Sequence, residues 1–184
     1  DDSATVSVSN PTVTVAEGGS PAVFTLTQSA VSASDTVISY AFTPGTASTA
    51  DVSGITASVA TISAGQSTAV VTIATNNDTI VEQSETFTVA LSKVSGDASI
   101  SLTTPTATGT ITDSDTALLR IFAADGNPSQ SVPESVGDAP RFFLSLTAQS
   151  STDTTVTYNV GGDATSGTDY GAISSVAIIS AGTT

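Results

Sequence analysis

Residues 77–91 read Asn77-Asp78-Thr79-Ile80-Val81-Glu82-Gln83-Ser84-Glu85-Thr86-Phe87-Thr88-Val89-Ala90-Leu91. In the second half of this stretch Phe87, Val89 and Leu91 fall on one face, with Thr86 and Thr88 opposite. Alternation with a period of two predicts a β-strand that buries one face. The same pattern recurs at residues 5–8, 12–15, 24–27, 35–42 and 107–112, with turn-forming residues between the runs. Short strands at this spacing, without helical periodicity, predict an all-β fold of immunoglobulin-like antiparallel β-sandwiches.

The charge balance narrows the possible functions. The 184 residues include 17 Asp and Glu, 3 Lys and Arg, no His and no Cys, for a formal charge of −14. Lack of His removes the usual general base, so we do not expect an enzyme. Nucleic-acid binding needs clustered Lys and Arg, and a membrane span needs about 20 apolar residues; neither pattern is present. The remaining chemistry is that of carboxylates and hydroxyls, which suits a hard cation such as calcium.

The sequence also repeats itself. Four pairs of matching motifs lie 117 or 118 residues apart, since 134 − 17 = 117, 158 − 40 = 118, 169 − 51 = 118 and 179 − 62 = 117. The paired residues are Glu17 and Glu134, Tyr40 and Tyr158, Asp51 and Asp169, and Ile62 and Ile179. A constant offset predicts two tandem copies of one domain, residues 1–115 and 116–184.

The second copy is expected to be incomplete. The first copy continues for 50 residues after Gly65, to Asp115, whereas two residues follow Gly182. The second copy therefore lacks the counterparts of the last three predicted strands, which would leave apolar surface and strand edges exposed. We expect either a longer chain or strands from another molecule to complete it.

The order of the motifs resembles the Calx-beta domain, which occurs in sodium/calcium exchangers, in integrin β4 and in large bacterial surface proteins. The motifs are Glu17-Gly18, Ser48-Thr49-Ala50-Asp51 with its counterpart at 164–170, the acidic segment 77–87, and the ending Ile111-Thr112-Asp113-Ser114-Asp115. The resemblance covers essentially the whole chain. It implies that carboxylates gathered at one end of the sandwich bind Ca²⁺.

Matched positions give the implied calcium ligands. In the first copy they are Glu17, Asp51, Asp78, Glu82, Asp113 and Asp115, with Glu85 as a further candidate. The second copy keeps Glu134 and Asp169 but lacks the remaining ligand segments. Asn77 stands where the family usually has the first of two Asp residues, which removes one charge from the expected site.

The sequence therefore predicts a calcium-stabilised structural module of an extracellular repeat array at a bacterial cell surface, such as a stalk, an adhesin or a surface filament. Its partners would be neighbouring repeats or identical subunits, and a surface or carbohydrate ligand could bind elsewhere in the protein. Two alternatives remain open. One is a calcium sensor coupled to a partner, and the other is a filament subunit assembled by strand complementation.

Overall fold

The structure, a computed structural model, describes residues 2–54, 58–123 and 141–184. These residues form strands and turns, and no helix among them is long and apolar enough to cross a membrane. The chain divides into two compact units. The first consists of residues 1–78 and 83–114, and the second consists of residues 115–184 together with the short segment 79–82.

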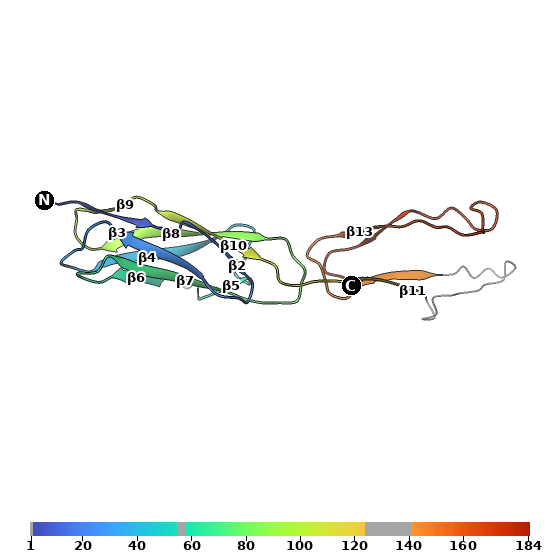
Figure 1. Ribbon diagram of the computed structural model, residues 1–184, viewed down its shortest axis with the longest axis horizontal. Helices are drawn as coiled ribbons and strands as arrows, with labels where there is room; N and C mark the ends of the chain where they lie inside the picture. Colours follow the sequence, from blue (N-terminus) through green and yellow to red (C-terminus); the bar gives the residue numbers. More distant parts are fainter. Residues whose placement is uncertain (1, 55–57, 124–140) are drawn as a thin grey trace. The chain divides into compact units, whose positions relative to one another are not determined.

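The first unit is a β-sandwich of two five-stranded sheets (Figure 1). One sheet has the order β5-β7-β3-β1-β9 and the other β2-β10-β8-β4-β6. The strands are β1 (Ala4–Val8), β2 (Thr12–Ala16), β3 (Ala22–Gln28), β4 (Thr36–Pro44), β5 (Val52–Ser53), β6 (Ser58–Ile62), β7 (Thr68–Thr75), β8 (Glu85–Ser95), β9 (Ile100–Leu102) and β10 (Thr106–Thr112). The strands predicted from alternation are therefore confirmed.

The strand pairing is antiparallel except at the N-terminal strands. β1 pairs in parallel with β9, and β2 pairs in parallel with β10; the chain changes sheets between β1 and β2. Where the chain changes sheets, the Asn10 side chain bonds to the backbone of β3 in place of a β1 residue. Its Nδ2 donates to the Val23 carbonyl (2.7 Å), and its Oδ1 accepts the Thr25 N–H (2.7 Å). The next residue, Pro11, has no N–H to leave unpaired. Residues 9–11 thus let one N-terminal segment serve both sheets.

The core lies between the two sheets and is built around three aromatic rings in contact. Phe87 meets Phe24 edge to face, with 6.4 Å between ring centroids, and meets Phe42 at 5.4 Å. Gly109 lies opposite Phe87 in the β8–β10 ladder, and a Cβ there would lie 2.1 Å from the Phe87 ring. The predicted inward face of β8 is confirmed, since Phe87, Val89 and Leu91 are all buried.

The second unit repeats two strand pairs of the first. β11 (Leu119–Ala123) pairs with β12 (Phe142–Leu146), and β13 (Thr154–Thr157) pairs with β14 (Val176–Ile179). Their registers match those of β1 with β3 and of β4 with β6: Leu119–Leu146 corresponds to Val6–Gln28, and Thr154–Ile179 to Thr36–Ile62. A side-chain bond is also repeated. Asp35 Oδ1 accepts the Ala64 N–H at 2.8 Å, and Asp153 Oδ1 accepts the Ala181 N–H at 2.9 Å.

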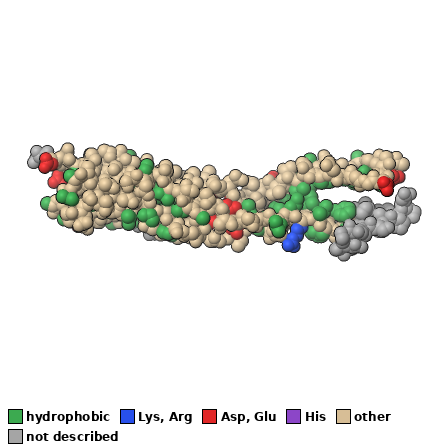
Figure 2. All heavy atoms as spheres, viewed as in Figure 1, with side chains coloured by type: hydrophobic (Ala, Val, Ile, Leu, Met, Phe, Trp, Pro, Cys, Tyr) green, Lys and Arg blue, Asp and Glu red, His purple; other side chains and the backbone are tan. Residues whose placement is uncertain are grey.

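Apolar side chains that are covered in the first unit are exposed in the second. Phe142 corresponds in register to Phe24, but 56% of Phe142 is exposed against 1% of Phe24. Figure 2 shows such side chains as green surface on the second unit.

In the first unit four strands follow Gly65, from β7 to β10, one more than the sequence predicts. The additional strand, β9, has only three residues, too few for alternation to reveal it.

Candidate metal centre

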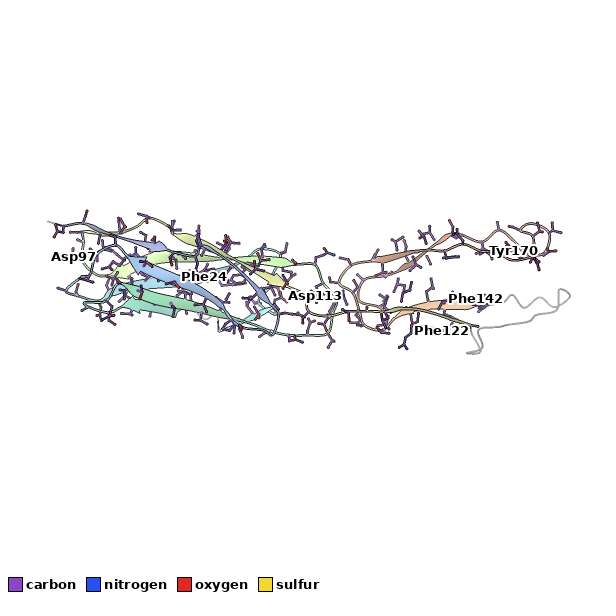
Figure 3. All side chains as sticks on the ribbon, in the orientation of Figure 1. Phe24, Asp97, Asp113, Phe122, Phe142 and Tyr170 are labelled. Atoms are coloured by element: carbon purple, nitrogen blue, oxygen red, sulfur yellow. The ribbon has the colours of Figure 1, made fainter. Side chains whose placement is uncertain are left out.

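Two of the predicted ligands, Glu17 and Asp113, directly follow the ends of neighbouring strands. β2 ends at Ala16 and β10 ends at Thr112, and these two residues are partners in the parallel ladder. The Glu17 N–H donates to the Thr112 carbonyl at 3.0 Å, which extends the pairing by one residue. Glu17 and Asp113 therefore leave the sheet side by side. Figure 3 shows Asp113 just beyond the strands of the sandwich that contains Phe24.

Glu17, Asp113 and Asp115 form what we call the first acidic group. One carboxylate oxygen from each lies within 4.8 Å of the other two. Only 8% of Glu17 is exposed. Its Oε1 accepts bonds from the Ser114 N–H (3.3 Å) and the Ser114 hydroxyl (3.1 Å). Ser114 was not among the site residues predicted from the sequence. Its position between the predicted ligands Asp113 and Asp115 is the sequence feature that could have indicated it.

Asp51, Glu82 and Glu85 form the second acidic group, again with one oxygen from each within 4.8 Å. Asp51 precedes β5, and its Oδ2 accepts the Ser48 N–H at 2.5 Å. Glu85 begins β8 and is the ladder partner of Ile111, two residues before Asp113. The two groups therefore lie at the same end of the sandwich. Glu85, the further candidate from the sequence, joins Asp51 and Glu82.

The two groups place six formal negative charges at one end of the sandwich, three in each. Lys93 does not neutralise them, because its Nζ donates to the carbonyls of Asp97 (2.8 Å) and Ile100 (2.6 Å). Lys93 lies eight residues along β8 from Glu85, or about 26 Å at the rise of a strand. Close carboxylates without a cation repel each other. A set of oxygen donors with irregular spacing suits Ca²⁺, which accepts six to eight oxygens in flexible geometry.

Asp78, another predicted ligand, lies in neither group. It follows β7 in a loop where Asn77 Nδ2 donates to the Asp78 carbonyl at 2.7 Å. Asn77 packs against Gly18, which has φ +56°, and a Cβ at Gly18 would lie 2.5 Å from the Asn77 Cβ. The turn after Glu17 thus requires a glycine beside Asn77. The role of Asp78 as a ligand stays a prediction.

The second copy repeats the local turn at one of its two predicted ligands. Asp169 Oδ2 accepts the Thr165 N–H at 2.6 Å, much as Asp51 accepts the Ser48 N–H. The structure brings Asp169 into neither acidic group. Glu134 lies outside the described residues. The described part of the second copy therefore holds one predicted acid in its expected loop, and that acid belongs to no group of three close acidic side chains.

Comparison with known proteins agrees with the motifs. The sequence profile of the Calx-beta domain matches residues 1–115 and 126–183, most of the chain. The chain belongs to the Calx-beta domain family. Calx-beta domains are calcium-binding modules, a binding and regulatory family and not a catalytic one. No curated protein matches the chain.

Solved structures share the Calx-beta fold. The chain is similar to the apo form of the Calx CBD1 domain, with 20% identity and a TM-score of 0.55 over 62% of this chain and 100% of the other. It is also similar to CBD12 from CALX1.2, with 14% identity and a TM-score of 0.53 over 76% and 68% of the two chains. A third match is the calcium binding domain CBD12 of CALX1.1, with 14% identity and a TM-score of 0.50 over 83% and 78%. At these identities the likeness shows the fold alone.

Proposed function

We propose that the acidic end of the first Calx-beta domain binds Ca²⁺ and that the chain is a calcium-stabilised structural module of an extracellular repeat array. The observation that carries the proposal is the pair of acidic groups, each with three carboxylate oxygens within 4.8 Å. Three like charges at that distance repel each other, a bound cation would offset that repulsion, and oxygen ligands favour calcium over transition metals. The absence of His and Cys from the chain supports the same choice of metal.

The position of the first group supports a structural role. Asp113 and Asp115 directly follow β10, the last strand of the sandwich, while Glu17 follows β2 near its start. A bound ion would tie the closing segment of the domain to its opening segment. Because residue 116 begins the predicted second copy, the ion would also restrict the hinge between copies. The array would be extended with calcium and more flexible without it, with neighbouring repeats or identical subunits as its partners.

The working range of such a module fits an extracellular setting. Extracellular calcium modules bind with dissociation constants of about 10⁻⁴–10⁻³ M, which suffices where calcium is millimolar. The chain contains neither Cys nor Met, so it has no thiol or thioether that could be oxidised outside the cell. We therefore propose an extracellular role, and the resemblance to large bacterial surface proteins suggests a stalk, an adhesin or a surface filament of a bacterial cell.

Calcium removal tests the proposal. The melting temperature and protease resistance of the full chain are measured in EDTA and in increasing CaCl₂. We expect the melting temperature to rise with calcium, and cleavage near residues 112–118 to slow. If EDTA and calcium give the same melting temperature and the same cleavage rate, the calcium-stabilised module is wrong.

A further inference from the structure

A four-residue segment pairs with a loop of the second unit. Within that unit the Val81 N–H donates to the Gln149 carbonyl at 2.8 Å, and the Ser151 N–H donates to the Val81 carbonyl at 3.0 Å. Val81 and Ser150 form a parallel β-bridge. Residues 149–151, which we call the second-copy loop, thus bind the segment 79–82 through backbone groups.

The first copy contains the same loop at residues 31–33, the first-copy loop. Its counterpart residues differ by 118, since 150 − 32 = 118. Ser32 accepts the Ser34 N–H at its hydroxyl (3.2 Å) and the Gly65 N–H at its carbonyl (2.8 Å). Ser150 does the same for Thr152 (3.3 Å) and Gly182 (2.8 Å). The turns beside the loops are also held in the same way, because Asp35 accepts the Ala64 N–H and Asp153 accepts the Ala181 N–H. The two loops therefore share the same hydrogen bonds and the same conformation.

No segment among the described residues pairs with the first-copy loop. Gln149 corresponds to Val31, and Ser151 corresponds to Ala33. Among the described residues neither the Val31 carbonyl nor the Ala33 N–H has a hydrogen-bond partner, and 64% of Val31 is exposed. The backbone groups that bind segment 79–82 in the second copy are thus available in the first.

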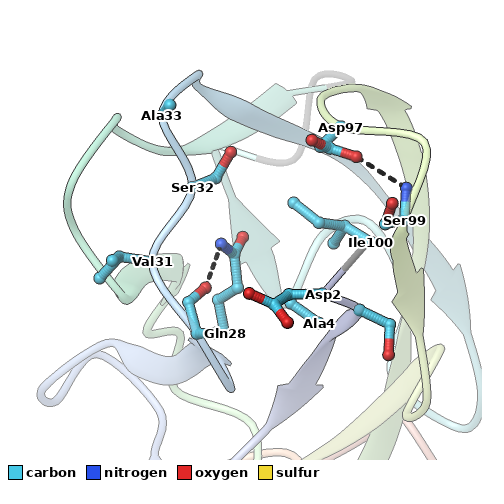
Figure 4. Close-up of a pocket in the computed structure, with 11 residues that line it drawn as sticks. Asp2, Ala4, Gln28, Val31, Ser32, Ala33, Asp97, Ser99 and Ile100 are labelled. Carbon is cyan, nitrogen blue, oxygen red and sulfur yellow. Dashed lines mark hydrogen bonds between the residues drawn. The ribbon is translucent and has the colours of Figure 1, made fainter.

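A cavity of about 370 Å³ lies beside the first-copy loop (Figure 4). Residues 30–33 line it together with Asp2, Gln28 and Asp97. Only 2% of Gln28 is exposed; its Nε2 donates to the Ala30 carbonyl at 2.7 Å, and its Oε1 has no hydrogen-bond partner among the described residues. This end of the sandwich therefore combines an open loop, an exposed Val and a buried acceptor that lacks a donor.

We infer that the first-copy loop binds residues 79–82 of a preceding copy of the same domain. In that pairing the preceding copy's Val81 N–H donates to the Val31 carbonyl, and the Ala33 N–H donates to its Val81 carbonyl. The occupant is a further copy because segment 79–82 of this chain already pairs with the second-copy loop. The inference rests on the proposed repeat array but not on calcium binding. Each copy would thereby lock its successor in one register.

The test adds one copy to the full chain. Residues 4–113 are placed directly before Asp1, so that Asp1-Asp2-Ser3 takes the place of Ser114-Asp115-Thr116 and the junction keeps its length. Amide hydrogen exchange at Ala33 and Ser151 is measured by NMR in the original and the extended chain. We expect the Ser151 N–H to be protected from exchange in both chains. We expect exchange of the Ala33 N–H of the original first copy, not of the added copy, to slow roughly tenfold or more in the extended chain only.

Two variants of the added copy separate pairing from general stabilisation. Val81→Pro in the added copy removes the N–H that would bond to Val31, and should return Ala33 to fast exchange. Val81→Ala keeps the N–H, and should leave Ala33 protected. Fast exchange at Ala33 in the extended chain, or equal exchange in the Pro and Ala variants, would overturn the inference. The melting temperature with and without calcium, recorded on the same samples, tests the proposed function separately.

Discussion

Replacing Asp113 by Asn removes one charge of the first acidic group and keeps the size of the side chain. Without a cation, the three carboxylates have oxygens within 4.8 Å and repel each other in three pairs. One pair at that distance costs about 0.9 kcal/mol in the dielectric of bulk water, and more inside protein. Asp113→Asn removes two of the three pairs. We therefore expect the metal-free variant to be more stable than the wild type by about 2 kcal/mol.

Calcium should cancel this advantage. A ligand that binds the native state stabilises it by RT ln(1 + [L]/Kd). At about 10 mM calcium and a Kd of about 10⁻⁴–10⁻³ M, this amounts to about 1.4–2.7 kcal/mol for one ion. The variant has lost a ligand and should gain little. In calcium the wild type and Asp113→Asn should therefore have nearly equal stability.

The assay is scanning calorimetry of the full chain in EDTA and in 10 mM CaCl₂. For a domain of this size 1 kcal/mol shifts the melting temperature by about 4 °C, so the metal-free variant should melt about 8 °C higher. Asp163→Asn is the matched control, because Asp163 is an exposed acid outside both groups and loses the same charge. A variant that melts lower than the wild type in EDTA would refute the repulsion argument. A variant that gains as much from calcium as the wild type would refute the role of Asp113 as a ligand.

Two further predictions concern other parts of the molecule, and a third concerns the choice of metal ion. Gly109→Ala should lower stability by about 1–3 kcal/mol in urea titration, because the new Cβ would meet the Phe87 ring at 2.1 Å; Phe87→Leu in the same chain should recover part of the loss. The pKa of Asp97 should lie below 3.8 in an NMR titration, because the Ser99 N–H and hydroxyl bond to its carboxylate; its stabilising effect is present at neutral pH and is lost as the pH falls through that lowered pKa. Mg²⁺ should raise the melting temperature less than Ca²⁺ at equal concentration, because it demands stricter octahedral geometry, and an equal rise would contradict a loop-built calcium site.

The alternation in the sequence predicts most of the sandwich because each strand has one buried face. Phe24, Phe87 and Ile111 are all on faces that the sequence marks as apolar, and all are buried. The parallel pairings of β1 and β2 could not be predicted in this way. They depend on which distant strand lies alongside, and on the change of sheet between β1 and β2, where the Asn10 side chain bonds to β3.

The residue types of the site and its position at one end of the sandwich could be predicted from the sequence. Its division into two groups of three acids could not. Acids that follow strand ends can be matched to family positions from the sequence alone, and six of the seven first-copy candidates lie in the two groups. Which acid joins which group depends on strand neighbours. Glu17 meets Asp113 because β2 and β10 are parallel partners, and Asp51 meets Glu85 because β5 and β8 both begin at this end of the sandwich. Asp78 lies on a loop whose course Asn77 and Gly18 set, and no sequence pattern encodes that contact.

The burial of Glu17 joins the stability of the fold to the chemistry of the site. A carboxylate that is 8% exposed loses most of its hydration, and burying its charge is costly. The two bonds from Ser114 offset part of that cost but also hold the group beside two more acids. The Phe24–Phe87 core lies between the sheets and needs no cation to pack. We therefore expect the metal-free domain to be less stable at its acidic end than in its middle, so that a bound ion would stabilise the segment through which one copy continues into the next.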